Sequence, residues 1–363
     1  MYSRLSTINS MPHLKDKKVI VRIDSDVDIK DGKITDDTRL VSCLETIDYL
    51  IQKGSTVVLV GHLGRPEKQY EVLDFPSTIP VYLKKFSLEP VALWFEEKFK
   101  GNLQDIKYDS FSGWKITDNL FLLENIRFYK GEEENDARFA ASLAKIADFY
   151  VNEAFAVSHR KNASVSGVTH FLPSFAGLHL DQEISILTRI MENPKRPLVV
   201  LIGGAKIETK LPMVEQMHHI ADYVLVGGEI AEQDKVLIKV QHEKIGGQKS
   251  MVFVADVKDN LKDVTPKSVE NFEQVINIAQ TIVWNGPIGE IGEDKKNEEG
   301  TKKIAQAIAS SHAYKIVGGG DTLAFLSKEN LLSKFDFVST GGGAMLEFLS
   351  GKKLPGITPL LKH

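Results

Sequence analysis

The chain alternates between short apolar runs and longer stretches in which apolar residues recur every three or four positions. The runs are rich in valine, leucine, isoleucine and phenylalanine, which is typical of strands buried on both faces of a parallel sheet. They lie within residues 19–24, 55–62, 120–125, 148–155, 198–206, 223–229, 315–322 and 336–344. Helical spacing follows the first run at Leu40, Val41, Leu44, Ile47, Leu50 and Ile51, and Gly54 ends that helix.

This alternation of strands and helices predicts an α/β fold with parallel sheets, whose binding sites lie at the carboxyl ends of the strands. A further helix is expected over about 135–147. Near 173–197 the pattern changes to one long helical stretch between prolines. We therefore expect two lobes, over 1–174 and 196–345, a hinge helix over 175–195, and a tail over 346–363.

Glycine clusters follow the apolar runs in the second half of the chain, at 203–204, 227–228, 318–320 and 341–343. Bare backbone at a strand end lets N–H groups close on a phosphate. Lys206 and Lys210 come directly after the first cluster, where two cations at a helix start favour a bound anion. A pair of solvated surface lysines is the alternative. Neither a Walker A motif nor a G-x-G-x-x-G fingerprint is present.

Asp321 and Thr322 follow the triple glycine at 318–320. A hard cation such as Mg²⁺ is bound by carboxylate and phosphate oxygens together, so Asp321 is the candidate metal ligand. The same two residue types also favour a helix N-cap, and one residue can serve both purposes.

The first half of the chain carries cations where the second half carries glycine. Arginine's rigid fork suits carboxylate and phosphate, and strand ends in one sheet converge in space. A single such arginine is more often a solvated surface residue, and a lone histidine can equally belong to the core. The group comprises Arg39, His62, Arg65, Arg127 and Arg160. We therefore expect the first half to bind a small polyanion and the second half to bind a nucleotide. Two such sites together predict phosphoryl transfer between the two ligands.

Composition and charge exclude several classes of protein. The 363 residues carry a net charge of −4, which argues against general binding to nucleic acid or to a membrane surface. Cys43 is the only cysteine, so no internal disulfide or cysteine-based zinc site is expected. We find neither a signal peptide nor an apolar run of the ~18 residues that span a bilayer, so we expect a cytoplasmic protein.

Ordered motifs along almost the whole chain resemble those of phosphoglycerate kinase. They include VIVRIDSDVD, GHLGRP, LLENIRF, YVNEAF, SHRKNAS, GGAKIETK, TIVWNGP, GGGDT and STGGGA. The resemblance implies two Rossmann-like lobes, a hinge-bending monomer, and a tail that returns to the first lobe. It also implies reversible phosphoryl transfer between 1,3-bisphosphoglycerate and Mg²⁺-ADP, which gives 3-phosphoglycerate and ATP.

The resemblance also assigns site residues. Catalysis is assigned to Arg39, Lys206 and Gly320. The phosphoglycerate site would consist of Asp24, Asp26, Arg39, His62, Arg65, Arg127 and Arg160. The nucleotide site would consist of Gly204, Lys206, Lys210, Asn285, Pro287, Glu293, Gly319, Gly320, Asp321 and Thr322, with Asp321 on Mg²⁺.

Several positions depart from the family pattern. Asp26 replaces an asparagine, which adds a negative charge beside an anionic substrate unless an arginine pairs with it. Glu229 replaces a glycine, the stretch from there to Trp284 is short, and the glutamate that holds the ribose falls one place late, at Glu293. Two alternatives stay open: a non-catalytic paralogue that binds nucleotide or phosphoglycerate, and a kinase that acts on another acid phosphate.

Overall fold

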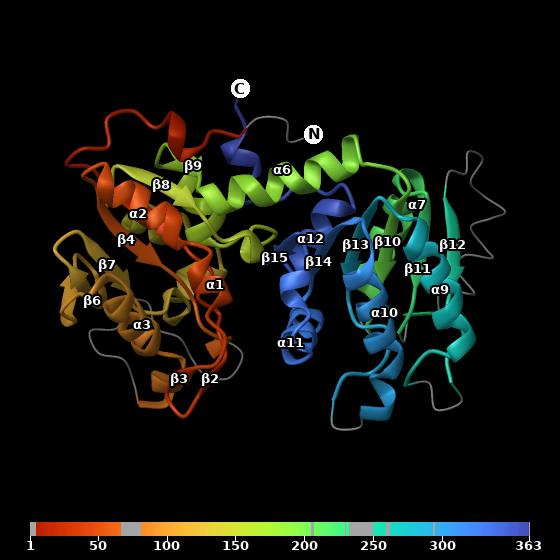
Figure 1. Ribbon diagram of the computed structural model, residues 1–363. Coiled ribbons are helices and arrows are strands. Elements are labelled where there is room, and N and C mark those ends of the chain that lie inside the picture. Colours follow the sequence, from red (N-terminus) through yellow and green to blue (C-terminus); the bar gives the residue numbers. More distant parts are fainter. Residues whose placement is uncertain are drawn as a thin grey trace. The chain divides into compact units, whose positions relative to one another are not determined.

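The computed structural model describes residues 5–66, 81–204, 207–228, 230–231, 250–258, 262–292 and 295–362, and it describes the backbone but not the side chains of 207–209. The chain divides into two compact units, 1–185 with 353–363 and 186–352. The division falls inside the helix α6, Leu178–Glu192 (Figure 1). The lobe and hinge limits expected from the sequence stay a prediction.

The described part of unit 1 is built on a seven-stranded sheet with the order β5-β6-β7-β4-β1-β8-β9. Its strands are β1 (Lys18–Arg22), β4 (Thr56–Val60), β5 (Gln104–Tyr108), β6 (Phe111–Thr117), β7 (Leu120–Leu123), β8 (Phe149–Asn152) and β9 (Ser174–Ala176). Its helices are α1 (Thr38–Val41), α2 (Leu44–Gln52), α3 (Glu89–Phe99), α4 (Lys130–Glu133) and α5 (Ala137–Ala144). A small hairpin pairs β2 (Ile29–Lys30) with β3 (Lys33–Ile34).

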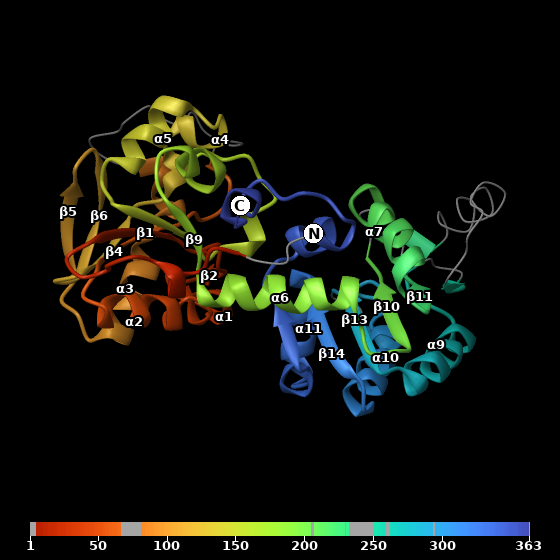
Figure 2. The ribbon, with the colours of Figure 1, turned by 90° about the horizontal axis from the view of Figure 1, so that it is seen from above.

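Alternate side chains of each central strand in unit 1 pack on opposite faces of the sheet. Val19 and Val21 belong to the apolar cluster that includes residues of α2 and α3, whereas Ile20 belongs to the cluster that includes α5. Figure 2 shows α2 and α3 on one side of these strands and α4 and α5 on the other. Burial on both faces explains why the strands read as uninterrupted apolar runs.

Two features of unit 1 correct the sequence predictions. The sheet is not parallel throughout, because β5 pairs antiparallel with β6, and β6 with β7. The single helix expected over Leu40–Ile51 is two helices, α1 and α2, with Val41 exposed. Ser42 Oγ donates to the carbonyl of Arg39 and Cys43 Sγ to that of Leu40, so side chains compete for the helical acceptors at the break.

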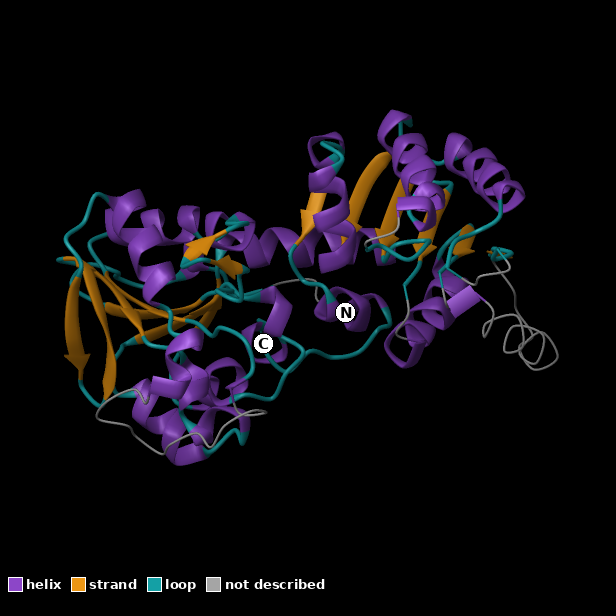
Figure 3. Cartoon of the chain, turned by 90° about the horizontal axis from the view of Figure 1, so that it is seen from below, coloured by secondary structure: helices purple, strands orange, loops and turns teal. Residues whose placement is uncertain are grey.

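The described part of unit 2 is built on a six-stranded sheet with the order β12-β11-β10-β13-β14-β15, in which every pairing is parallel. Its strands are β10 (Leu198–Ile202), β11 (Tyr223–Val226), β12 (Met251–Val254), β13 (Thr281–Asn285), β14 (Tyr314–Gly318) and β15 (Phe337–Ser339). Its helices are α7 (Ile207–Ile220), α9 (Pro266–Ile278), α10 (Glu299–Ser310), α11 (Gly320–Lys328) and α12 (Gly343–Leu349). Figure 3 shows helices on both faces of the strands in each unit. The predicted two-lobed α/β class is confirmed.

The segment 353–362 packs in unit 1. Leu5 and Leu361 form an antiparallel bridge, and the amide of Ser6 donates to the carbonyl of Leu360 at 2.7 Å. The amide of Gly356 donates to the carbonyl of Ser158. Within the part of the chain that the structure describes, no helix is both long and apolar enough to cross a bilayer.

Candidate active site

The carboxyl ends of β1 and β4 place the first candidate residues side by side. Arg22 pairs with Val60 in the sheet, so the loops that follow the two strands run next to each other. Ser25 Oγ donates to the carbonyl of His62 at 2.8 Å and joins the loops. Gly61 is required there, because a Cβ at this position would lie 2.9 Å from the Cβ of Ser25.

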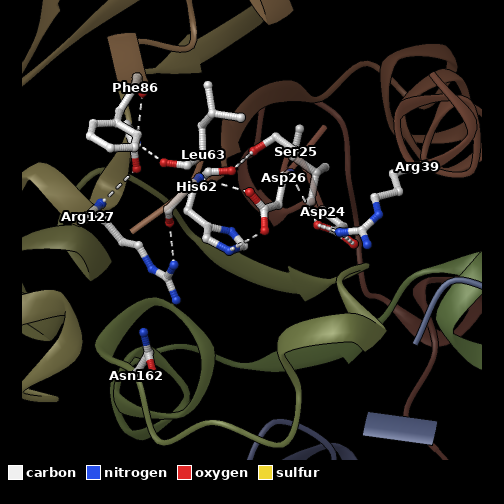
Figure 4. A network of polar contacts seen from close by, with 12 residues as sticks. Asp24, Ser25, Asp26, Arg39, His62, Leu63, Phe86, Arg127 and Asn162 are labelled. Carbon is white, nitrogen blue, oxygen red and sulfur yellow. Dashed lines mark hydrogen bonds and ion pairs between the residues drawn. The ribbon is translucent and has the colours of Figure 1, made fainter. Parts of the chain in front are cut away.

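Asp24 and Arg39 form an ion pair at this edge. Arg39 Nη1 lies 3.1 and 3.3 Å from the two carboxylate oxygens of Asp24 (Figure 4). Burial raises the pKa of the Asp24 carboxyl, and the charge of Arg39 opposes that rise. Asp24 in turn raises the pKa of Arg39. The pair holds a half-exposed guanidinium in a fixed position beside the strand end.

His62 is buried, with 2% of its side chain exposed. Its Nδ1 lies 3.3 Å from Arg22 Nη2, and its Nε2 lies 3.8 Å from Asp26 Oδ2. The pKa of His62 is well below its usual range because the ring is buried and because cations surround it: Arg22, Arg127, Arg160 and Arg39. His62 is therefore neutral at pH 7, and it is a buried residue at the edge of the candidate site.

Asp26 lies in front of His62. Its Oδ1 accepts a hydrogen bond from the amide of Gly64 at 2.8 Å, and 42% of its side chain is exposed. Figure 4 shows the side chains of Asp26 and His62 pointing toward each other. Among the described residues, no arginine forms an ion pair with Asp26, and the nearest ring nitrogen is that of the neutral His62 at 3.8 Å. Asp26 acts on Arg39 and Arg160 only through its charge.

Arg127 comes from the short helix η4 (Ile126–Phe128), whose first amide bonds to the carbonyl of Gly61 at the end of β4. It is buried, donates to the carbonyl of Gly64 at 2.5 Å and pairs with Glu133 at 2.9 Å. Burial lowers the pKa of Arg160, and the charges of Arg127 and Arg65 lower it further, which brings these three cations into one field. Arg65 itself is exposed.

The structure thus gathers four arginines and the neutral His62 at one edge of unit 1, and we call this group the cationic cluster. It consists of Arg39, His62, Arg65, Arg127 and Arg160. The two predicted acidic residues, Asp24 and Asp26, lie beside it. Several arginines in a partly buried field suit a small, multiply charged anion.

In unit 2 the glycine-rich ends of neighbouring strands form a second candidate site, which we call the glycine edge. The amide of Gly203 bonds to the carbonyl of Asn285, and Asn285 pairs with Gly318. Gly204 and Gly319 adopt φ angles of 92° and 98°, which favour glycine. The glycine edge consists of Gly204, Asn285, Pro287, Gly319, Gly320, Asp321 and Thr322.

Three of the predicted nucleotide residues have defined contacts at the glycine edge. Thr322 is buried, and its Oγ1 accepts from the amide of Gly286 at 3.0 Å. The buried Lys210 donates to the carbonyl of Gly203. Asn285 Nδ2 lies 3.8 Å from the sulfur of Met345. Lys206, Glu229 and Glu293 lie outside the described residues, as does part of the short stretch that follows Glu229.

A cavity opens at this edge. It is lined by glycines, by apolar side chains and by a few charged ones, among them Gly204, Gly228, Pro287, Ile288, Glu290 and Asp321. Gly320 opens α11, and a Cβ there would meet nothing within 4 Å. The first turn of α11 is therefore uncrowded at Gly320, and a helix start of this kind suits an anion.

Asp321 fits the predicted magnesium. It is exposed, it stands in the first turn of α11, and it lines the cavity. The described residues contain no group of three or more histidine, cysteine, aspartate or glutamate side chains that could hold a metal by themselves. Mg²⁺ accepts such a site, because it is usually bound by one or two carboxylates, with phosphate oxygens and water completing its shell.

Sequence reasoning missed the polar network behind His62. Glu132 is fully buried, and its carboxylate accepts from the amide of Ser164 at 2.8 Å and from its hydroxyl at 2.7 Å. Asn162 also donates to Glu132, and Ser164 Oγ accepts from Arg22 Nε at 2.9 Å. The run of three glutamates at 132–134 looks like a solvated surface, so no signal in the sequence marked Glu132.

The family model described as Phosphoglycerate kinase matches residues 8–252 and 234–352 of the chain. Among curated proteins, phosphoglycerate kinase of Dictyoglomus turgidum is 37% identical over 388 residues, and that of Thermosipho africanus is 38% identical over 397 residues; each match covers 96% of both chains. Among solved structures, phosphoglycerate kinase of Coxiella burnetii is 34% identical with a TM-score of 0.77, over 98% of this chain and 99% of that one. The enzyme of Pyrococcus horikoshii is 26% identical with a TM-score of 0.76, over 98% of each chain.

The fold, the two candidate sites and these relatives define a phosphotransferase. The chain belongs to the phosphoglycerate kinase family. The kinase interpretation of the sequence is confirmed, and the relatives give no support to a non-catalytic paralogue.

Proposed function

We propose that the cationic cluster binds 3-phosphoglycerate and 1,3-bisphosphoglycerate and that the glycine edge binds ADP and ATP. The observation that carries the proposal is the neutral His62 among four arginines at the ends of β1 and β4. A neutral hydrogen-bond donor within a positive field suits a ligand that carries a carboxylate and a phosphate. The backbone of Gly204 and the start of α11 suit the nucleotide phosphates.

The reaction is an in-line displacement in which ADP accepts the phosphoryl group of an acyl phosphate. Its transition state is loose, so catalysis consists of alignment and of neutralising charge on the transferred group. We assign the neutralisation of that charge to Arg39, which Asp24 holds in place, and to Lys206. Mg²⁺ on Asp321 would neutralise the nucleotide phosphates. Since the two ligands bind residues of different units, the proposal requires the units to close during reaction and to exclude water.

The test is a coupled assay that consumes ATP in the presence of 3-phosphoglycerate. We expect turnover that needs both substrates and Mg²⁺ and that EDTA abolishes. If the protein turns over another acid phosphate but not 3-phosphoglycerate, the proposed substrate is wrong and the other acid phosphate replaces it. Binding of either ligand without any turnover would overturn the assignment of the reaction.

The Asp26→Asn variant is expected to bind 3-phosphoglycerate more tightly. Asp26 occupies the amide of Gly64 and adds a negative charge in front of His62. Asparagine can still accept from Gly64 but gains a donor and loses the charge, which is worth about 1 kcal/mol. Isothermal titration with 3-phosphoglycerate measures the change.

Asp28→Asn is the matched control, because it removes the same charge from a nearby exposed position. If both variants bind alike, the effect of Asp26 is long-range charge alone. Weaker binding by Asp26→Asn would show that the Asp26 carboxylate orients the site and does not oppose the ligand.

Nucleotide choice is expected to be loose. Around the cavity Ile288 and Ile291 are apolar, while Lys262 and Glu290 pair with each other at 3.0 Å. Binding energy then comes mainly from the phosphates, which all nucleoside diphosphates share. We predict values of kcat/KM for ADP and GDP that differ by less than about tenfold, or ~1.4 kcal/mol. A preference of about a hundredfold, measured at equal Mg²⁺ and salt, would contradict this prediction.

We further propose that the protein acts as a cytoplasmic monomer. The proposal rests on the family resemblance, and the lone cysteine, Cys43, is buried and so does not link two copies through a disulfide. Size-exclusion chromatography with light scattering tests the oligomeric state, and a second copy in the active species would contradict it.

A further inference from the structure

The guanidinium of Arg22 is the most completely enclosed cation at the end of β1. Only 1% of the residue is exposed. Its Nε donates to Ser164 Oγ at 2.9 Å, its Nη1 donates to the carbonyl of Ile23 at 2.5 Å, and its Nη2 lies 3.3 Å from His62 Nδ1. Each nitrogen of the fork therefore faces a different partner, and one of these partners is the imidazole.

This contact determines which nitrogen of His62 carries the proton. Arginine has five N–H donors and no acceptor, and it stays charged in proteins. Nδ1 must then present its lone pair to Arg22. Because the ring is neutral, its single proton resides on Nε2, the nitrogen on the side of Asp26 and the cationic cluster.

A carboxylate behind Arg22 balances its charge. Ser164 Oγ, which accepts from Arg22, donates to the buried Glu132 at 2.7 Å, and the amide of Ser164 donates to the same carboxylate at 2.8 Å. Burial lowers the pKa of Arg22, and the charge of Glu132 is the largest influence that opposes this shift. A series of hydrogen bonds thus runs from Glu132 through Ser164 to Arg22. It holds the guanidinium on the side away from His62, so that Nη2 faces the imidazole ring.

We propose that Arg22 is a positioning residue that holds His62 as its neutral Nε2–H tautomer, so that the imidazole offers a fixed donor to an oxygen of the acid phosphate. The substrate part of this inference rests on the proposed function. Arg22 is not a catalytic residue, because it is buried and each nitrogen of its guanidinium already faces a protein group. A donor fixed in advance binds an anion without the cost of reorientation.

The first test needs no variant and no ligand. In ¹⁵N-histidine-labelled protein at pH 7, long-range ¹H–¹⁵N correlation distinguishes a protonated ring nitrogen from a bare one, and a His62→Gln sample assigns the signals. We expect Nε2 to be protonated and Nδ1 to be bare. A Nδ1–H tautomer, or a ring protonated at both nitrogens, would overturn the proposal even if the enzyme is fully active.

The second test uses Arg22→Lys, which keeps a positive charge for Glu132 but cannot reach Ser164, Ile23 and His62 with one nitrogen. We expect mixed tautomers at His62 and a roughly tenfold higher KM for 3-phosphoglycerate, the scale of one hydrogen bond to a charged group. The KM for ATP should not change. An unchanged tautomer together with an unchanged KM for 3-phosphoglycerate would overturn the proposal.

Ser164→Ala is the matched control, since it loosens the same network but leaves Nη2 beside His62. We expect it to lower the melting temperature while His62 keeps its Nε2–H tautomer. If Ser164→Ala mixes the tautomers as much as Arg22→Lys does, general loosening explains the effect and the role of Arg22 is wrong. A wild type with the expected tautomer but no turnover would overturn the proposed function alone.

Discussion

Replacing Arg39 with alanine is expected to lower kcat by about two to four orders of magnitude, the usual scale for removing one cation that stabilises charge in transit. The ion pair with Asp24 at 3.1 Å holds the guanidinium at the strand end, where its donors are fixed before substrate binds. Because this charge matters most in the transition state, KM should change much less than kcat. Steady-state kinetics with 3-phosphoglycerate and ATP provide both parameters. Lys206 has the same expectation from the sequence.

Arg138→Ala is the matched control for Arg39→Ala. Arg138 also belongs to unit 1 and pairs with an aspartate, but 95% of its side chain is exposed. Its removal should leave kcat and KM unchanged. If Arg39→Ala raises KM for 3-phosphoglycerate and leaves kcat intact, Arg39 is a binding residue and its assignment to the transferred phosphoryl group is wrong.

Replacing Glu132 with alanine is expected to cost about 3–5 kcal/mol of unfolding free energy, the scale for removing one partner of a buried charge pair. The substitution leaves Arg22 buried without its largest opposing charge, and it leaves the amide and hydroxyl of Ser164 without the carboxylate that accepts from them. Urea denaturation followed by circular dichroism measures the loss as a lower midpoint.

Glu134→Ala serves as the control, because Glu134 directly follows α4, is 58% exposed and forms only a surface pair with Lys130. It should stay within about 0.5 kcal/mol of the wild type. Glu132→Gln keeps the shape of the side chain and removes its charge, so it should fall between the two. Equal midpoints for Glu132→Ala and Glu134→Ala would show that the buried carboxylate contributes nothing net.

The central strands could be predicted because their sequence and their environment agree. β1, β4, β10 and β11 are buried on both faces, and apolar runs ending in glycine or in polar residues mark them clearly. β5 could not be found this way, since it lies at the sheet edge and its side chains are exposed or half-buried. Its antiparallel pairing with β6 depends on a turn at Asp109, where φ is 55°. The pattern of apolar residues gives no sign of this turn.

The cationic cluster was predictable for a geometric reason. Parallel strands in one sheet bring their carboxyl ends together, so Arg39, His62 and Arg127 could be grouped without a structure. The buried network behind these residues could not be predicted from the sequence, because Glu132 and Ser164, which are hydrogen-bonded, lie 32 residues apart in the chain. Tertiary packing decides whether such a charge is buried. The sequence of the acidic run at 132–134 does not show which of its glutamates is buried.

The bridge between Leu5 and Leu361 bears on how the protein is made. A ribosome makes residue 5 before unit 2 and residue 361 after it, so the nascent unit 1 must wait for its partner segment until unit 2 has been made. Residues 186–352 form unit 2 from one uninterrupted stretch and can complete their fold earlier. Synthesis thus favours an order in which unit 2, although it is started second, can be finished first, because the bridge between Leu5 and Leu361 forms only after residues 186–352 have been made.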